Sequence, residues 1–292
     1  PGTGGHIKEL PEDFVVEEIP SYEPVGEGDH LFLKIKKRDR TTDEIARRIA
    51  DVAELKPMEI GFAGRKDKRA ITTQWFSVPA DRSIQQLESI QSEDVQILDH
   101  GLHGNKLRTG HVSANRFTIT IRGVSEDAEE RAREILNEIE RFGLPNAFGP
   151  QRFGRRGENP KQVLTWLRGK RRPPKNKGRL KMLFSSFQSM LFNDLLRIRL
   201  ERDLFVHALL GDIMKLHERG GMFLAEEREG LDERLERKEI SPTGPIFGAK
   251  MWWPESEAKE LESEILAKVD VTLEQLDKFK KAGKGTRRPI RL

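Results

Sequence analysis

The chain of 292 residues contains 52 Lys and Arg, 48 Asp and Glu, and no cysteine, and its mean hydropathy is −0.64. This length suits two domains, and the composition excludes disulfides, cysteine-ligated zinc, iron–sulfur clusters and a thiol nucleophile. No apolar run approaches the ~18 residues of a membrane span, and no signal-peptide core follows the N-terminus, so we expect a cytoplasmic protein without a membrane partner.

The first half of the chain interleaves strand patterns with helix patterns. Thr42 is the predicted N-cap of a helix through IARRIADVAEL that Pro57 ends, and Ser125 is the predicted N-cap of a second helix with Gly143 as its C-cap. GRKDKRA is predicted to form a bend between two strands. The predicted strands are DFVVEEI, HLFLKIKKR (30–38), EIGFAG, TTQWFSV (72–78), QILDHG and the alternating, half-buried RFTITIRGV (116–124).

The second half is more helical and forms a separate unit by its composition. RGKRRPPKNKGR (168–179) is rich in Pro, Gly and charge, which predicts a domain boundary or an exposed loop. ISPTGPIFG (240–248) is predicted to be a turn-rich connection. The predicted helices are SFQSMLFNDLLRIRLERDL (186–204), ESEAKELESEILAKV and LEQLDKFKKAG. Strands interleaved with helices indicate an α+β or α/β mixed sheet.

The net charge of +4 is distributed unevenly along the chain. Residues 151–182 carry twelve Lys or Arg and one acid, Glu158, which gives this segment a charge of +11. Such a one-sided block suits a phosphate-binding surface, and it equally suits a solvated linker.

Asp67 is the single acid in GFAGRKDKRAITTQ (61–74), and two cations precede it and two follow it. Nearby cations favour an ionised carboxylate, which suits a nucleophile or a weak general base. A turn aspartate without catalytic function fits the same pattern.

NAFGPQRFGRRG (146–157) places two Phe, an Asn, a Gln and an Arg within nine residues. Aromatic rings beside amides and Arg suit single-stranded RNA, because bases stack on rings while amides and Arg contact base edges and phosphates. A packed turn with capping polar groups is the alternative. His100, His103 and His111 also lie close together, and we expect them to face solvent rather than to bind metal.

The two motifs, in this order, resemble the TruD family of tRNA pseudouridine synthases. AGRKDKRAITTQ matches the signature around the family's catalytic Asp, and NAFGPQRFG matches N-x-F-G-x-Q-R-F-G. The N-terminal pattern of a Lys followed by F-x-V-x-E is matched by Lys8 with Phe14, Val16 and Glu17. KLRTG, NRFT, FQSMLFN, SPTGPIFG and GTRRP extend the resemblance over almost the whole chain.

The resemblance implies an α+β fold: a pseudouridine synthase catalytic domain, with a mixed sheet flanked by helices, and an inserted second α/β domain. We expect residues 1–170 to form the N-terminal part of the catalytic domain and residues 171–288 the inserted domain. Residues 289–292 then begin the return to the catalytic domain, whose remainder lies outside this sequence.

The implied activity is isomerisation of a tRNA uridine, at position 13 of the D-arm, to pseudouridine by one catalytic Asp. No metal, nucleotide or other cofactor is implied, and the partner is tRNA. Oligomeric state is left open, with a monomer as the default. A non-catalytic RNA-binding or RNA-folding protein that retains the synthase cleft is the alternative.

The resemblance also implies a role for each motif residue. Asp67 is the catalytic group and Lys8 its basic partner, while Thr73 and Gln74 brace the loop from the adjacent strand. The residues expected to contact the substrate RNA are Lys8, Phe14, Asn146, Phe148, Gln151, Arg152, Arg65 and Lys68. Among these, Phe14 and Phe148 lie near the target base, Asn146 hydrogen-bonds beside Asp67, and Arg65 and Lys68, with Lys66 and Arg69, flank the cleft mouth.

Overall fold

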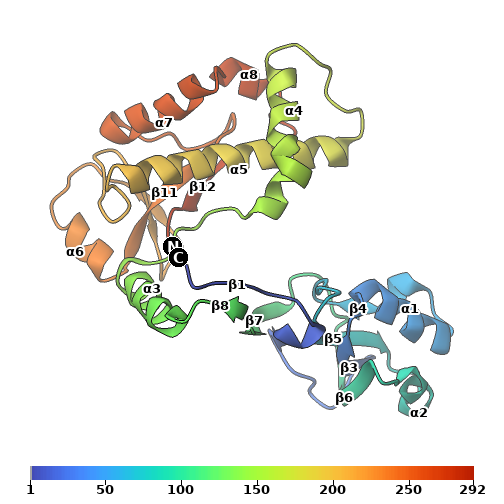
Figure 1. Cartoon of the computed structure of the whole chain (residues 1–292). Helices are drawn as coiled ribbons and strands as arrows, with labels where there is room; N and C mark the ends of the chain where they lie inside the picture. The colour runs from blue at the N-terminus through green and yellow to red at the C-terminus, as the bar shows by residue number, and fades with distance from the viewer. Residues whose placement is uncertain (1) are drawn as a thin grey trace. The chain divides into compact units, whose positions relative to one another are not determined.

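The structure is a computed structural model that describes residues 2–292. The chain divides into two compact units, residues 1–133 and 134–292 (Figure 1). Both units combine sheets with helices, which confirms the predicted α+β class. The predicted boundary at residue 170 separates the catalytic domain from an inserted domain, which is a different question from the division into compact units. That boundary stays a prediction. No helix in residues 2–292 has the length and apolar character needed to cross a membrane.

The first unit is built on a six-stranded sheet with the order β6-β3-β5-β2-β7, and β4 pairs with β5. Strands β2 and β5 are parallel, and the other pairs are antiparallel. Strands β1 and β8 form a separate two-stranded sheet. The strands are β1 (Gly4–His6), β2 (Phe14–Pro20), β3 (His30–Arg38), β4 (Gly61–Phe62), β5 (Ile71–Pro79), β6 (Val95–His103), β7 (Val112–Ile119) and β8 (Arg122–Val124).

Helices α1 (Thr42–Val52) and α2 (Ile84–Leu87) cover the part of the sheet formed by β6, β3 and β5. Short 3₁₀ turns lie at Pro11–Asp13, Pro57–Glu59 and Glu88–Ile90. Leu33 and Ile35 of β3, Ile49 of α1 and Phe76 of β5 are fully buried in this core. The alternating apolar positions of the predicted strands therefore face the helices, as their period of two requires.

The expected cap of α1 and the expected burial of RFTITIRGV were both wrong. Thr41, not Thr42, caps α1, because its hydroxyl accepts the backbone N–H of Glu44 while the Glu44 carboxylate accepts that of Thr41. RFTITIRGV is not half-buried: Phe117, Ile119 and Ile121 are 54%, 45% and 45% exposed. The reason is position, since β7 is the edge strand farthest from β6 and the helices pack over the other end of the sheet.

Helix α3 (Ala128–Phe142) runs through the division between the units and ends at Gly143, whose φ of 82° is the left-handed value expected of a helix C-cap. Ser125 was expected to be the N-cap, but α3 begins at Ala128, and the residue directly before it is Asp127. The Ser125 carbonyl accepts the N–H of Ala128, but its hydroxyl donates to the carbonyl of Thr3.

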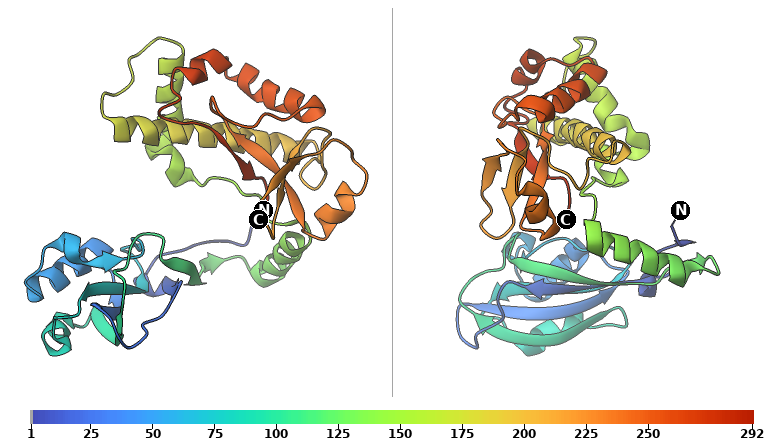
Figure 2. Two further views of the ribbon diagram at one scale, coloured as in Figure 1. Left: turned by 180° about the vertical axis from the view of Figure 1, so that it is seen from behind. Right: turned by 90° about the vertical axis from the view of Figure 1, so that its left-hand side faces the viewer.

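The second unit is organised around the 25-residue helix α5 (Lys177–Glu201), which packs against α4, α7 and β11 (Figure 2). Its sheet is antiparallel, with the order β10-β9-β11-β12. Two 3₁₀ turns at Pro150–Phe153 and Arg155–Gly157 precede α4. The elements are α4 (Glu158–Leu167), β9 (Ile213–Leu216), β10 (Met222–Leu224), α6 (Leu231–Glu236), β11 (Ile240–Ile246), α7 (Ser256–Lys268), α8 (Leu273–Asp277) and β12 (Thr286–Pro289).

The largest departure from expectation is ISPTGPIFG, most of which forms β11, one of the two inner strands of the sheet, rather than a turn-rich connection. Its glycine permits close packing instead of a turn: a Cβ on Gly244 would lie 2.8 Å from the Phe192 ring of α5. Pro242 still takes part in the sheet, because its carbonyl accepts the N–H of Ile290. The helix predicted from residue 186 begins at Lys177, where the Asn176 side chain caps it.

Candidate functional site

Asp67 lies in the loop between β4 and β5, and its carboxylate is accessible. The Lys8 ammonium donates to Asp67 Oδ2 at 3.1 Å, and the two side chains are 29% and 55% exposed respectively. The ion pair expected between these residues is therefore present. Lys8 also has a φ of 62°, a left-handed value that is strained for any residue other than glycine. Strain of this kind occurs at functional sites, where surrounding contacts enforce it.

The Lys8 side chain also covers an aromatic ring. Its ammonium lies 3.8 Å from the centroid of the Phe14 ring, and Phe14 is buried. Phe117 of β7 packs edge-on against Phe14, with the ring centroids 5.8 Å apart, and remains exposed. The expected place of Phe14 near the target base stays a prediction; in the structure Lys8 covers the Phe14 ring, and Phe117 is the exposed ring of the pair. Phe117 lies in the matched NRFT segment, but the alternation of RFTITIRGV predicted a half-buried position for it.

The four cations beside Asp67 do not act as one group. Arg65 pairs with Asp43 at 3.0 Å, and Arg69 donates to the carbonyl of Glu9. Lys68 lines a polar cavity of about 650 Å³ together with Arg38, Asp39, Arg40, Glu93 and Asp94.

Lys66 was expected at the cleft mouth, and this expectation was wrong. Its side chain turns inward, is 8% exposed and pairs with Glu18. A buried ammonium that already has a carboxylate partner is not available to RNA phosphates.

The backbone of the Asp67 loop is held from the core side by Thr42 and Gln74. The Thr42 hydroxyl accepts the N–H of Lys66 at 2.9 Å and donates to Gln74 Oε1 at 2.8 Å. Gln74 Nε2 in turn donates to the carbonyl of Gly64 at 3.1 Å. The bracing role expected of Gln74 is present. Sequence reasoning did not identify Thr42 as part of this hydrogen-bond network, because its position suggested a helix N-cap.

Lys37 of β3 is a third support and is almost completely buried. Its ammonium donates to the carbonyls of Arg40, at 2.5 Å, and Asp67, at 3.5 Å. Burial lowers the pKa of Lys37 to about 8, an effect that the charges of Glu44 and Asp67 partly oppose. The Asp67 loop is therefore fixed at several backbone atoms while its carboxylate stays open.

The second motif lies in the other unit, where Asn146 is buried and bonded. Asn146 Nδ2 donates to the carbonyl of Pro289 at 2.9 Å, and Oδ1 accepts from the Arg288 guanidinium. Arg288, in GTRRP, was not singled out by sequence reasoning, although it also lies over the Phe148 ring at 4.3 Å. The predicted hydrogen bond of Asn146 beside Asp67 joins residues of different units and stays a prediction.

Gln151 and Arg152 are exposed and line an open cavity of about 630 Å³ with Gly149, Pro150, Asn159 and Met182. Arg152 is oriented by α5, because its Nε donates to the Ser189 hydroxyl at 3.1 Å and its guanidinium also bonds Ser185. This arrangement holds the Arg152 guanidinium at a cavity whose lining is largely apolar.

His100 is exposed as expected, but His103 and His111 pack against Tyr22 rather than facing solvent. His103 stacks on Tyr22 with centroids 4.6 Å apart, and His111 Nδ1 bonds the Tyr22 hydroxyl. Within residues 2–292, no group of three or more His, Cys, Asp or Glu side chains is arranged to hold a metal ion.

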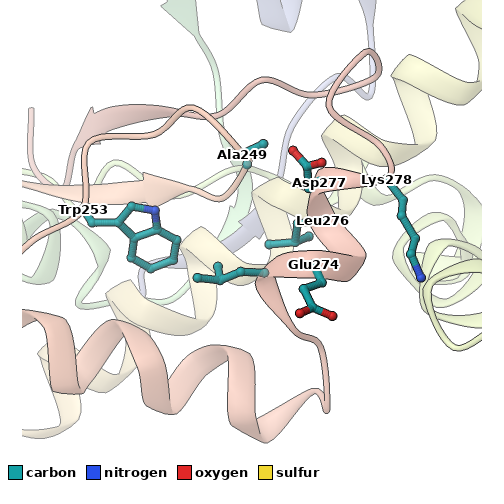
Figure 3. Close-up of a pocket in the computed structure, with 8 residues that line it drawn as sticks. Ala249, Trp253, Glu274, Leu276, Asp277 and Lys278 are labelled. Carbon is teal, nitrogen blue, oxygen red and sulfur yellow. The ribbon is translucent and has the colours of Figure 1, made fainter.

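A further cavity of about 520 Å³ lies between Trp253 and α8 in the second unit (Figure 3). Its lining is largely apolar, with Leu273 and Leu276, and the carboxylate of Asp277 pairs with Lys280 at 3.3 Å. No residue of the two motifs lines it, so it is not part of the candidate site.

Comparisons with known proteins agree over the whole chain. The family described as tRNA pseudouridine synthase D (TruD) matches residues 1–167 and 175–292. A tRNA pseudouridine synthase D of Thermus thermophilus is 43% identical over 299 residues, covering 100% of this chain and 80% of that protein. Another, from Anaeromyxobacter sp., is 39% identical and is covered over 84% of its length. The crystal structure described as a tRNA pseudouridine synthase D from Methanosarcina mazei has a TM-score of 0.84 at 24% identity, covering 100% of this chain and 85% of that one, which shows likeness of fold.

Proposed function

Because this chain belongs to the TruD family of tRNA pseudouridine synthases, we propose that it converts a uridine of tRNA to pseudouridine with Asp67 as its single catalytic group. The proposed target is position 13 in the D-arm, and the proposed place of action is the cytoplasm, where tRNA is available. The observation that carries the proposal is an accessible carboxylate, paired with Lys8, on a loop whose backbone is held from the core side.

The reaction breaks the N1–C1′ glycosidic bond, turns the uracil and forms a C5–C1′ bond, after which C5 loses its proton. A carboxylate can start this sequence by attacking the sugar or the base, or by removing the 2′-hydrogen to give a glycal. Each route needs an ionised carboxylate close to the ribose, and neither needs a metal or a nucleotide. The fixed loop supplies the orientation on which either route depends.

The second unit supplies the charge that a tRNA substrate requires. All twelve Lys and Arg side chains of residues 151–182 are exposed. Across the part of the chain that the structure describes, only one of them, Lys161, has a carboxylate within ion-pair distance. Unpaired, exposed cations favour phosphate binding over a solvated linker, because each can replace a condensed counterion on RNA. Arg65 and Lys68 of the Asp67 loop are proposed to contact phosphates beside the target uridine.

The test is conversion of unmodified tRNA, mapped by primer extension after carbodiimide treatment. The chain should produce one new stop in the D-arm, and the Asp67→Asn variant should produce none while its affinity for tRNA changes by less than about three-fold. Asp51→Asn, at an exposed position of α1, is the matched control and should convert normally. Binding without conversion by the unaltered chain would instead identify a non-catalytic RNA-binding protein that retains the cleft.

A further inference from the structure

The residue directly before Asp67 carries a buried charge. The Lys66 ammonium lies 2.9 Å from Glu18 Oε2 and donates to Asn115 Oδ1, and the Lys66 and Glu18 side chains are 8% and 1% exposed. The Glu18 contact is an ion pair without hydrogen-bond alignment, and Oε2 has no other partner in residues 2–292. Lys66 therefore directs its side chain into the unit, while the next residue presents its carboxylate outward.

Glu18 is placed where two parallel strands separate. The register of β2 with β5 runs from Val15–Ile71 to Glu17–Thr73 and then ends. Beyond that point, Glu18 Oε1 accepts the backbone N–H of Trp75 at 3.1 Å. One carboxylate thus replaces the missing strand partner of β5 and binds the loop residue next to Asp67.

The assignment of the sequence motif to Glu17 was wrong by one residue. Glu17 was matched to the family pattern, but the spacing F-x-V-x-E from Phe14 falls on Glu18. The structure separates the two residues clearly, because Glu17 is exposed and lies 3.7 Å from Arg116 of β7. Glu17 is therefore a natural comparison for Glu18 on the same strand.

We propose that Glu18 is a positioning residue for Asp67, acting through its buried ion pair with Lys66. The pair connects the loop to β2 and β5, and the Lys66–Asn115 bond connects it to β7. With Thr42 holding the Lys66 N–H, both the backbone and the side chain of the preceding residue are fixed. The direction of the Asp67 carboxylate toward the ribose depends on this tether. The inference rests on the proposed function.

The test separates positioning from stability by using single and double substitutions. Glu18→Gln and Lys66→Met each leave one buried charge unpaired, so both variants should lose stability. The double variant Glu18→Gln/Lys66→Met removes both charges and should regain much of that stability. We expect its single-turnover rate at saturating tRNA to remain about 100-fold below that of the unaltered chain, because misplacement of a catalytic group by ~1 Å costs about that factor. Its affinity for tRNA should change by less than about two-fold.

Glu17→Gln is the matched control and should keep the rate within about two-fold. A double variant that is stable and converts tRNA at nearly the original rate would overturn the positioning role. A rate that falls only in proportion to the fraction of folded protein in the variants would also overturn the positioning role. If the unaltered chain converts no tRNA, the proposed function fails and this inference fails with it, whereas conversion by the unaltered chain and the double variant alike overturns this inference alone.

Discussion

Replacing Lys8 by Ala and by Gly separates the charge of this residue from the strain of its backbone. Both substitutions remove the ammonium that pairs with Asp67 at 3.1 Å and covers the Phe14 ring at 3.8 Å. Only Gly relieves the left-handed φ of 62°. If the strain serves the site, the two variants should differ in stability and agree in activity.

The expected magnitudes follow from the exposure of the pair. Exposed ion pairs contribute ~0–1 kcal/mol and an exposed cation–π contact ~0.5–1 kcal/mol, so either variant loses roughly 0.5–2 kcal/mol of these contacts. A left-handed φ costs a residue other than Gly ~1–2 kcal/mol. Gly avoids this cost, but its greater conformational freedom in the unfolded chain lowers the stability of the Gly variant by ~0.4–1 kcal/mol. Lys8→Gly should therefore be more stable than Lys8→Ala by about 0.5–1 kcal/mol.

Activity should not follow this order. Both variants lose the cation beside Asp67, and removal of one preorganised electrostatic partner lowers rates by roughly 10²-fold or more. Urea unfolding monitored by circular dichroism gives the stability difference, and single-turnover conversion at saturating tRNA gives the rate. A Gly variant that is less stable than the Ala variant would refute the strain argument. Conversion near the original rate in either variant would refute the role of the ammonium.

Two further predictions concern buried charges. Burial lowers the pKa of Lys37 from 10.5 to about 8. Between these pH values Lys37 is therefore protonated in the unfolded chain and largely neutral in the folded chain. The free energy of unfolding should therefore gain up to about 3 kcal/mol from this group as pH rises from about 8 toward 10.5. Lys37→Met should abolish that gain in urea titrations at pH 7.5 and 10; an unchanged rise would contradict it. In the second unit, Arg287 forms two hydrogen bonds with Glu262, at 2.9 and 2.6 Å, and both side chains are buried. Glu262→Gln leaves Arg287 unpaired and should destabilise this unit by about 3–5 kcal/mol in thermal unfolding, and a loss below about 1 kcal/mol would show that the guanidinium finds another partner.

Local pattern predicted most of the first unit, because its strands have a period of two and its helices cover one face. The predictions failed where position in the sheet decides burial. RFTITIRGV has the alternation of a half-buried strand, yet the edge position of β7 leaves Phe117 and Ile119 exposed. In β11, Gly244 and the flanking prolines suggested a turn. The close packing of Phe192 of α5 against Gly244 is a contact between residues distant in the sequence, so the local pattern does not reveal it.

For the candidate site, the motifs identified the residues but not their partners. Asp67 and Lys8 were paired correctly because the family resemblance links them across 59 positions. Glu18 was missed because the motif was assigned to Glu17, although both the spacing F-x-V-x-E and the period of two place Glu18 on the buried face with Phe14 and Val16. Arg288 was missed because its partners, Asn146 and Phe148, lie about 140 residues earlier in the chain.

The charges around Asp67 show why composition alone misleads at such a site. The loop sequence suggests one carboxylate surrounded by four cations, yet Arg65 and Lys66 are each paired with an acid from another segment. Lys8, from a distant segment, is the cation in direct contact with the carboxylate. A cation with its own acid contributes little net field at a third group, because the two opposite charges largely cancel at that distance. Lys8 is therefore the cation that contacts the Asp67 carboxylate directly, while Lys66 holds the backbone of the loop that carries Asp67.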